Sequence, residues 1–289
     1  MTIQTAPASL ATKFINTTNR HIFLTGKAGT GKTTFLKHIV HHTHKKTVVA
    51  APTGIAAINA GGVTLHSLFH LPFGSFIPSN SFLQENMDVN IHTPKSLVKS
   101  IKMNSHKRKL INSIELLIID EVSMLRADML DAIDTVLRSV RKKRNLPFGG
   151  IQLLFIGDLL QLPPVVKRQE KEYLSAYYAS NYFFEAKVLE TQQPVYIELD
   201  KIFRQSDEDF ITILNHLRDN KLNSRDIEIL NKHYHPNFKP DPREGYIFLT
   251  THNNKANSIN NNELKKLDGT SYFCDAEVSG DFNEHLYPM

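Results

Sequence analysis

The sequence has one cysteine, no long apolar run and no acidic residue before Glu85. A lone cysteine, Cys274, excludes a disulfide framework and a cysteine metal cluster, which fits a reducing compartment. No apolar run approaches the roughly 18 residues of a membrane span, so no membrane partner is expected. With 289 residues, 41% of them hydrophobic and 22% charged, we expect about two folded domains and a cytosolic protein.

The positive charge is concentrated in the stretch before Glu85. Seven basic residues give this stretch a charge of +7, whereas the remaining 27 basic and 29 acidic residues give −2. Such an excess favours the binding of phosphate groups. A surface that later carboxylates balance in three dimensions explains the charge equally well.

Short apolar segments alternate with helical patterns along the first two thirds of the chain. This alternation predicts an α/β fold with a parallel sheet that is covered on both faces. In the helix predicted at 128–140, the apolar spacing predicts that Asp131, Asp134 and Arg138 face solvent. Strands are predicted at 22–25, 48–50, 116–119 and 153–156, and helices at 10–17, 32–41 and 128–140.

Two further segments depart from this alternation. Residues 71–112 are rich in proline, glycine and asparagine and too long for a simple connection, so they are predicted to form a small insert. After Pro194, the strand 195–199 is predicted to open a second, incomplete unit. Within that unit we expect helices near 207–218 and 225–233 and a strand at 246–249.

A glycine-rich loop follows the first predicted strand and opens the next helix. Its pattern, Gly26-x-x-x-x-Gly31-Lys32-Thr33, is typical of a phosphate-binding loop in this context, and a plain glycine-rich turn is the alternative. Lys32 is predicted to reach the β and γ phosphates, and Thr33 to give its hydroxyl to Mg²⁺. The predicted nucleotide contacts are Gly26, Ala28, Gly29, Thr30, Gly31, Lys32, Thr33 and Thr34.

Two carboxylates, Asp120 and Glu121, follow the apolar strand 116–119. The end of this strand should lie beside the phosphate loop at the carboxyl edge of the sheet. There Asp120 suits Mg²⁺, directly or through water, and Glu121 suits a general base that polarises the attacking water. Taken alone, such a pair is more often a helix cap, but the phosphate loop favours the catalytic interpretation.

Gln161 and Arg204 are weaker candidates for the same reaction. Gln161 follows the strand 153–156 and could hydrogen-bond the γ-phosphate or the attacking water, or simply lie solvated in a turn. Arg204 could act as an arginine finger, although a lone arginine is more often a structural or surface residue.

Two histidine- and lysine-rich segments have a structural explanation as well as a functional one. The cluster His38, His41, His42 and His44 is better explained as solvated than as a metal site, because no cysteine accompanies it. The basic residues 141–144 suit DNA and a solvated helix end equally well.

The motifs together resemble one family, the petite-integration-frequency (PIF-one) helicases of the RecD-like branch of superfamily-one DNA helicases. The resemblance covers nearly the whole chain. It rests on the phosphate loop and on the segments 51–57, 61–67, 120–124, 127–153 and 157–164, of which 127–153 resembles the signature segment of the family.

The resemblance implies a RecA-like motor lobe at 1–194, a wedge domain inserted at 71–112, and part of a second RecA-like lobe at 195–289. It implies that Pro52, Thr53, Thr64 and His66 line a path for single-stranded DNA, with Phe69 as a weaker candidate, and that Phe73 or Phe76 lies at the wedge tip. Local turn hydrogen bonds are the alternative role for Thr64 and His66.

The function implied is an ATP- and Mg²⁺-dependent DNA helicase that moves 5′ to 3′ on single strands and opens forks and G-quadruplexes. We expect a monomer, nucleoid-associated if the source is bacterial, with roles in DNA repair, recombination and telomere maintenance. The glutamine with which the family reads adenine has no match between Leu10 and Arg20.

The last two motifs of the family are also not found, so we expect a truncated motor. Two other functions stay open on the sequence alone. One is a module that binds nucleotide and DNA without unwinding, and the other is a P-loop ATPase that remodels protein.

Overall fold

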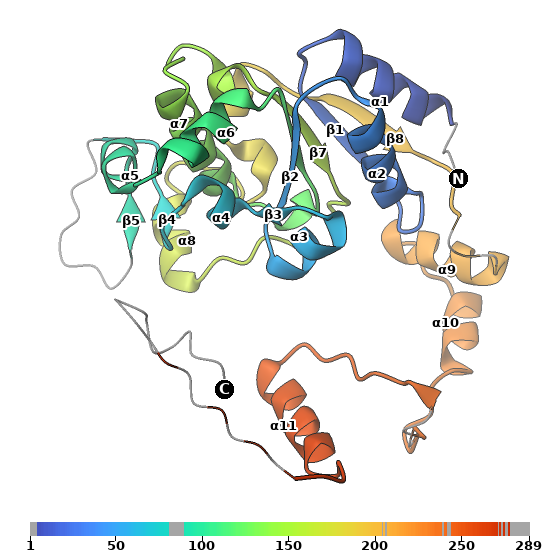
Figure 1. Cartoon of the computed structure of the whole chain (residues 1–289). Helices are drawn as coiled ribbons and strands as arrows, with labels where there is room; N and C mark the ends of the chain where they lie inside the picture. Colours follow the sequence, from blue (N-terminus) through green and yellow to red (C-terminus); the bar gives the residue numbers. More distant parts are fainter. Residues whose placement is uncertain are drawn as a thin grey trace. The chain divides into compact units, whose positions relative to one another are not determined.

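The computed structural model describes residues 5–80, 90–203, 205, 207–238, 240–241, 244–270, 272, 274 and 277. The chain forms two compact units, Met1–Asn223 and Ser224–Met289. Among the residues described, no helix is long and apolar enough to cross a membrane. The first unit is built on one sheet of parallel strands (Figure 1).

The sheet has six strands in the order β3-β2-β6-β7-β1-β8, and each neighbouring pair is parallel. The predicted α/β fold with a parallel sheet is therefore confirmed. The strands are β1 (Ile22–Gly26), β2 (Thr47–Ala51), β3 (Val63–Thr64), β6 (Leu116–Ile119), β7 (Gln152–Ile156) and β8 (Val195–Leu199).

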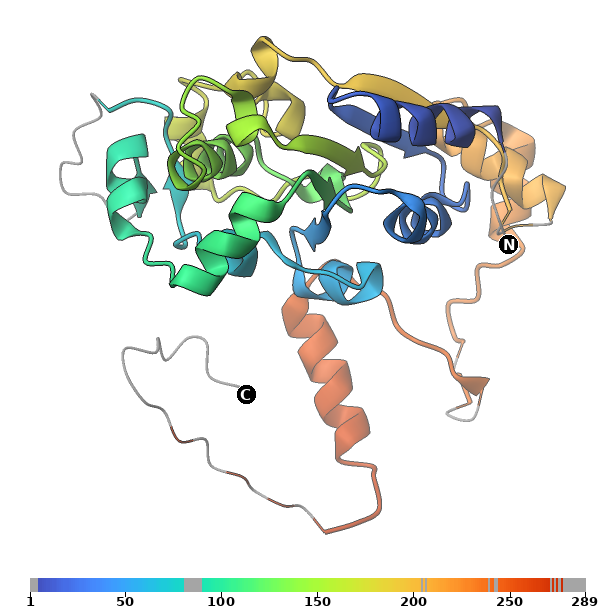
Figure 2. The same ribbon diagram turned by 45° about the horizontal axis from the view of Figure 1, so that its top comes forward.

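Helices cover both faces of this sheet, as the continuous apolar strands predict (Figures 1 and 2). Alternate residues of β6 point to opposite faces: Leu116 and Ile118 pack against α1 and α2, whereas Leu117 and Ile119 pack against α7. The covering helices are α1 (Ala6–Thr17) and α2 (Lys32–His42) on one face, and α4 (Leu65–Phe69), α5 (Pro94–Ser100), α6 (Ser105–Ser113) and α7 (Ala127–Val140) on the other.

The polar face of α7 corrects the sequence analysis, because Asp131 and Asp134 are buried rather than facing solvent. Asp131 accepts hydrogen bonds from the backbone N–H groups of Lys187 (2.9 Å) and Val188 (3.0 Å). Asp134 accepts one from the backbone of Phe148 and pairs with Arg138 at 2.7 Å. Distant loops thus supply the donors that make these buried carboxylates tolerable.

His21, just before β1, is buried and titrates far from its ordinary range. Its Nδ1 accepts a hydrogen bond from the backbone of Leu153 at 3.1 Å, and its ring meets Phe148 edge-on at 5.1 Å. Burial lowers the pKa of His21 from 6.5 to about 4. The imidazole is therefore neutral in the folded protein near pH 7.

This lowered pKa predicts a loss of stability in mild acid. The unfolded chain gains the His21 proton below pH 6.5 and the folded chain does not until about pH 4. Stability from this group is therefore present above pH 6.5 and is lost as the pH falls toward 4. Between pH 7 and pH 5 the expected loss is about 2 kcal/mol, measured by denaturant unfolding. His21→Asn, which keeps an acceptor for Leu153, should remove that loss; an unchanged pH dependence would contradict the assignment.

The predicted insert shares the core of the first unit. A two-stranded sheet of β4 (Ser75–Phe76) and β5 (Ile91–His92) precedes α5 and α6. Phe76, Leu97 and Ile111 are buried in the same apolar cluster as α7 and one face of the large sheet. Residues 81–89 of the predicted insert lie outside the described residues.

The strand 195–199 is placed differently from the prediction. It was expected to open the second unit, yet as β8 it pairs with β1 and completes the edge of the first sheet, because Ile197 and Leu199 bury their side chains with α1 and α2. The first unit continues through α9 (Glu208–Arg218), and its remaining elements are α3 (Gly54–Ala60), α8 (Arg168–Leu174), η1 (Val122–Met124), η2 (Pro147–Gly150), η3 (Phe183–Glu185) and η4 (Lys187–Glu190).

The second unit contains α10 (Ser224–Asn231) and α11 (Asn253–Leu264). The helices expected near 207–218 and 225–233 are thus present as α9 and α10. The strand expected at 246–249 is wrong: this stretch is irregular, and Ile247 and Leu249 are exposed. A strand needs a hydrogen-bonded neighbour, and the described residues of this unit provide none there.

Candidate functional site

The glycine-rich loop connects β1 to α2 at the carboxyl end of the central strands, where sequence analysis predicted it. Gly31 caps α2 with φ +89°, in the left-handed region that favours glycine. The Thr30 hydroxyl donates to the carbonyl of Lys27 at 2.9 Å and closes the loop. The first backbone N–H groups of α2 therefore open toward the pocket that this loop lines.

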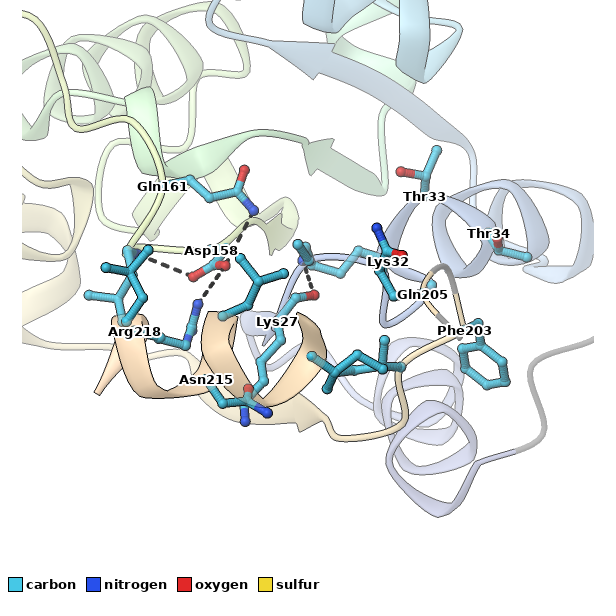
Figure 3. A pocket seen from close by; sticks show the side chains of 18 of the residues that line it. Lys27, Lys32, Thr33, Thr34, Asp158, Gln161, Phe203, Gln205, Asn215 and Arg218 are labelled. Atoms are coloured by element: carbon cyan, nitrogen blue, oxygen red, sulfur yellow. Dashed lines mark hydrogen bonds and ion pairs between the residues drawn. The ribbon is translucent and has the colours of Figure 1, made fainter. Parts of the chain in front are cut away.

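Lys32 is one of the side chains that line this pocket (Figure 3). Its Nζ donates to the carbonyls of Gly26 (2.7 Å) and Lys27 (3.0 Å), so the loop itself holds the ammonium group. Burial lowers the pKa of Lys32, while the charges of Asp158, Glu121 and Asp120 oppose that shift. The result is a partly desolvated positive charge facing three carboxylates, which suits a polyphosphate carried with a cation.

Asp120 and Glu121 end β6 beside the loop, as predicted. The backbone N–H of Glu121 donates to Asp120 at 3.0 Å, and Glu121 adopts φ +51°, a left-handed conformation that is uncommon away from glycine. Burial raises the pKa of Asp120 to about 6. Glu121 lines the pocket, whereas Asp120 is buried and is not one of the lining residues.

Gly157 allows this turn to lie close to the neighbouring strand end. A Cβ on Gly157 would lie 2.9 Å from the backbone nitrogen of Val122, in the turn that follows Glu121. A side chain there would push the turn away, so glycine keeps Glu121 beside the residues that follow β7.

Those residues bring Asp158 and Gln161 to the pocket. Asp158 is 1% exposed and accepts from Nε2 of Gln161 at 3.2 Å. It also forms an ion pair with Arg218 of α9 at 2.7 Å. Arg218 could not be identified from the sequence, because no local motif marks it and its partner lies 60 residues upstream.

Arg204 lies outside the described residues, but its neighbours reach the pocket. The backbone N–H of Phe203 donates to the carbonyl of Gly29 at 2.8 Å, and Phe203 and Gln205 line the cavity. The cavity has a volume of about 690 Å³, and Thr33 and Thr34 also line it.

Two residues of the histidine cluster and one residue of the basic segment make contacts within the fold. His38 and His42 stack at 4.1 Å, and the described residues hold no group of three or more metal-ligating side chains. Arg141 donates to backbone carbonyls of Ile111, Asn112, Ile114 and Gly149, so it joins α6, α7 and η2.

A second depression, about 530 Å³ in volume, collects several of the predicted DNA contacts. We call it the Thr53 groove; its lining includes Pro52, Thr53, His66, Phe73, Arg126 and Lys167. The rings of His66 and Phe73 stack at 5.5 Å, and Phe73 is 69% exposed. Thr53 also caps α3, accepting from Ala56 at 3.3 Å.

Three further candidates lie elsewhere. Thr64 does not line the Thr53 groove and caps α4, accepting from the backbone of Ser67 at 3.2 Å, which is the local role left open by the sequence. Phe69 is fully buried, so its ring has no face on which a base could stack. Phe76 is also buried, which leaves Phe73 as the exposed aromatic of the pair considered for the wedge.

These features define a class of protein. A phosphate loop after the first strand of a parallel sheet, with a carboxylate pair at the end of a strand that one further strand separates from it, is the arrangement of RecA-like P-loop proteins. The comparison with known proteins then narrows the class. The sequence profile described as PIF1-like helicase matches residues 6–228, and the chain belongs to this family.

Individual relatives agree with this assignment. The chain is 31% identical over 266 residues to the ATP-dependent DNA helicase PIF1 of Saccharomyces cerevisiae, an alignment that covers 90% of this chain and 28% of the relative. It is 36% identical over 198 residues to the human ATP-dependent DNA helicase PIF1, with 68% of this chain and 27% of the relative covered. The chain thus spans little more than a quarter of the length of these relatives.

Solved structures agree as well. The Pif1 helicase from Bacteroides in complex with ADP-AlF3 and single-stranded DNA has a TM-score of 0.84 and 39% identity, with 100% of this chain and 63% of that chain covered. The Pif1 helicase from Candida albicans has a TM-score of 0.71 and 29% identity, with 93% and 56% covered.

Proposed function

We propose that this chain is the ATP-binding part of a DNA helicase that moves 5′ to 3′ along single-stranded DNA. The observation that carries the proposal is the convergence of Lys32, Glu121 and Gln161 on one cavity at the sheet edge. The Thr53 groove, lined by different residues, is proposed to hold the DNA. Relatives described as ATP-dependent DNA helicases support this proposal.

The cavity residues suit hydrolysis of the γ-phosphate. The loop and α2 amides bind the phosphates, and Lys32 neutralises their charge. Glu121 takes a proton from water as the water oxygen forms a bond to the γ-phosphorus, and the bond to the bridging oxygen breaks to release ADP. Electrostatic stabilisation of the charge on the leaving phosphate is the main contribution of the loop.

Thr33 and Asp120 are proposed to hold Mg²⁺ with the nucleotide. A hydroxyl and a carboxylate form the oxygen donor set that this hard cation prefers. Burial raises the pKa of Asp120 to about 6, so a cation bound beside it would favour the ionised form of this carboxylate. When bound, Mg²⁺ would supply positive charge that offsets the negative charge on the phosphates during hydrolysis.

The Thr53 groove suits a DNA backbone with one stacked base. Small polar groups and loop backbone at Pro52 and Thr53 can grip phosphates without reading sequence, and Lys167 adds positive charge. The exposed Phe73 ring, stacked on His66, offers an aromatic platform. Forked and G-quadruplex DNA are proposed as substrates, and the protein is proposed to act as a monomer.

Phe73→Ala should weaken binding of a single-stranded oligonucleotide about 10-fold, because base stacking on an aromatic is worth about 1 to 3 kcal/mol. Fluorescence anisotropy with a labelled oligonucleotide measures this. Phe184→Ala, which removes an exposed ring outside the groove, serves as the control and should leave the affinity unchanged. If the Phe73→Ala variant and the unchanged chain bind the oligonucleotide with equal affinity, the assignment of the Thr53 groove as the DNA-binding site is contradicted.

The separate linings of the ATP cavity and the Thr53 groove support one alternative. The chain could bind nucleotide and DNA without coupling them, since coupling in two-lobe motors needs closure around the nucleotide. Strand separation by the 289-residue chain would exclude this alternative. Its absence, with both ligands bound, would support it.

A further inference from the structure

The side chain of Asp158 joins α9 to Gln161 inside the proposed ATP cavity (Figure 3). Its Oδ2 accepts from Nη1 of Arg218 at 2.7 Å and from Nε2 of Gln161 at 3.2 Å. Its Oδ1 accepts from the backbone of Leu160 at 3.2 Å. With 1% of its surface exposed, Asp158 depends on these donors rather than on water.

The charge of Asp158 determines which end of the Gln161 amide faces it. Burial alone would raise the pKa of Asp158, but the hydrogen bonds from Arg218, Leu160 and Gln161 outweigh burial and hold that pKa below its ordinary value. An ionised carboxylate only accepts hydrogen bonds, so the amide must turn its NH₂ group toward Asp158. Its carbonyl oxygen, Oε1, therefore points away from Asp158, and no described residue donates a hydrogen bond to it.

A carbonyl oxygen in this position can accept a hydrogen bond from water but cannot donate one to a phosphate. We propose that Arg218, acting through Asp158, positions Gln161 so that Oε1 accepts a hydrogen bond from the water that attacks the γ-phosphate. The inference rests on the proposed ATP hydrolysis and selects one of the two roles that the sequence leaves open for Gln161. One O–H of the water then points to Oε1 and the other to Glu121, and an oxygen lone pair is directed at the γ-phosphorus.

Arg218 keeps Asp158 ionised and so keeps the Gln161 amide in one orientation. Without its charge, burial would favour the protonated form of Asp158, whose hydroxyl can donate to Oε1 and so turn the amide around. Arg218 is a positioning residue in this account, because it contacts Asp158 and not the water. Its place at the end of α9 also means that a shift of this helix would alter the orientation of Gln161.

The test compares three ligands by isothermal titration calorimetry: ADP, a non-hydrolysable ATP analogue, and ADP with aluminium fluoride and Mg²⁺. The last ligand imitates the planar phosphoryl group with its attacking water. For Arg218→Gln we expect the affinity for ADP and for the ATP analogue to stay within about twofold of the unchanged chain. The affinity for the fluoride complex should fall about 10-fold, the size expected for one lost hydrogen bond of this kind.

Three variants make this result specific. Gln161→Ala should show the same selective loss, and the double variant should lose no more than either single variant, because both act on one interaction. Arg218→Lys keeps a charged donor and should recover part of the affinity. Lys221→Gln removes an exposed charge three residues beyond α9 and should behave like the unchanged chain.

Equal weakening of all three ligands by Arg218→Gln would mean that Arg218 contacts the nucleotide directly, which overturns the proposal. A selective loss of the ATP analogue relative to ADP in Gln161→Ala would show that Gln161 donates to the γ-phosphate, with the same consequence. If fluoride does not tighten ADP binding by the unchanged chain, no ordered acceptor for the water exists and the proposal fails. If the unchanged chain binds no ADP, the proposed function fails first, and this inference fails with it.

Discussion

Replacing Lys32 with alanine is expected to lower ATP turnover by about 100- to 1,000-fold and to weaken ATP binding as well. Lys32 is a positive charge in the lining of the cavity, and the carbonyls of Gly26 and Lys27 hold its ammonium group. Removing one preorganised group that stabilises transition-state charge typically costs this much in rate. The measurement is steady-state ATP hydrolysis, with nucleotide affinity determined in parallel.

Lys37→Ala provides the matched control for this prediction. Lys37 lies on the same helix, α2, but on its exposed side, and it does not line the cavity. Turnover should therefore stay unchanged in Lys37→Ala. Turnover retained in Lys32→Ala would contradict the role assigned to Lys32 and leave the loop as a simple turn.

Replacing Arg126 with alanine is expected to lower the free energy of unfolding by about 3 to 5 kcal/mol. Arg126 pairs with Asp128 at 2.7 Å and with Glu170 at 3.2 Å, and all three side chains are at most 12% exposed. It also donates to the Ser75 hydroxyl at 2.9 Å. The variant would leave two buried carboxylates without their cation, and an uncompensated buried charge strongly destabilises the folded state.

Chemical denaturation at pH 7 measures this loss. Lys187→Ala is the control, because Lys187 forms an exposed ion pair with Glu190 at 2.8 Å and should lose at most about 1 kcal/mol. Arg126 thereby joins Ser75 of β4 to Asp128 of α7 and Glu170 of α8. An equal loss of stability in the two variants would contradict a stabilising role for these contacts.

The sequence predicts the strands and the phosphate loop well because both depend on local patterns. An apolar run such as 116–119 is a strand buried on both faces, and the Gly26-x-x-x-x-Gly31-Lys32-Thr33 pattern between a strand and a helix marks the loop. Asp120 and Glu121 follow from the same reasoning, since the ends of parallel strands meet at one edge.

Long-range partners explain the predictions that are wrong. Helical spacing assigned Asp131 to solvent, because nothing near it in the sequence shows that Lys187 and Val188 donate to it. Arg218 was missed for the same reason, as only the fold brings it to Asp158. The strand 195–199 was assigned to the wrong unit because its apolar pattern does not show which sheet edge it joins.

The measurement that tests the central claim most directly is the rate of ATP hydrolysis by this chain with and without a single-stranded oligonucleotide at saturating concentration. The account predicts that the oligonucleotide raises the rate severalfold and that Lys32→Ala abolishes the increase. A rate that the bound oligonucleotide leaves unchanged would contradict a DNA-driven motor and favour either a binding module or an ATPase with another target.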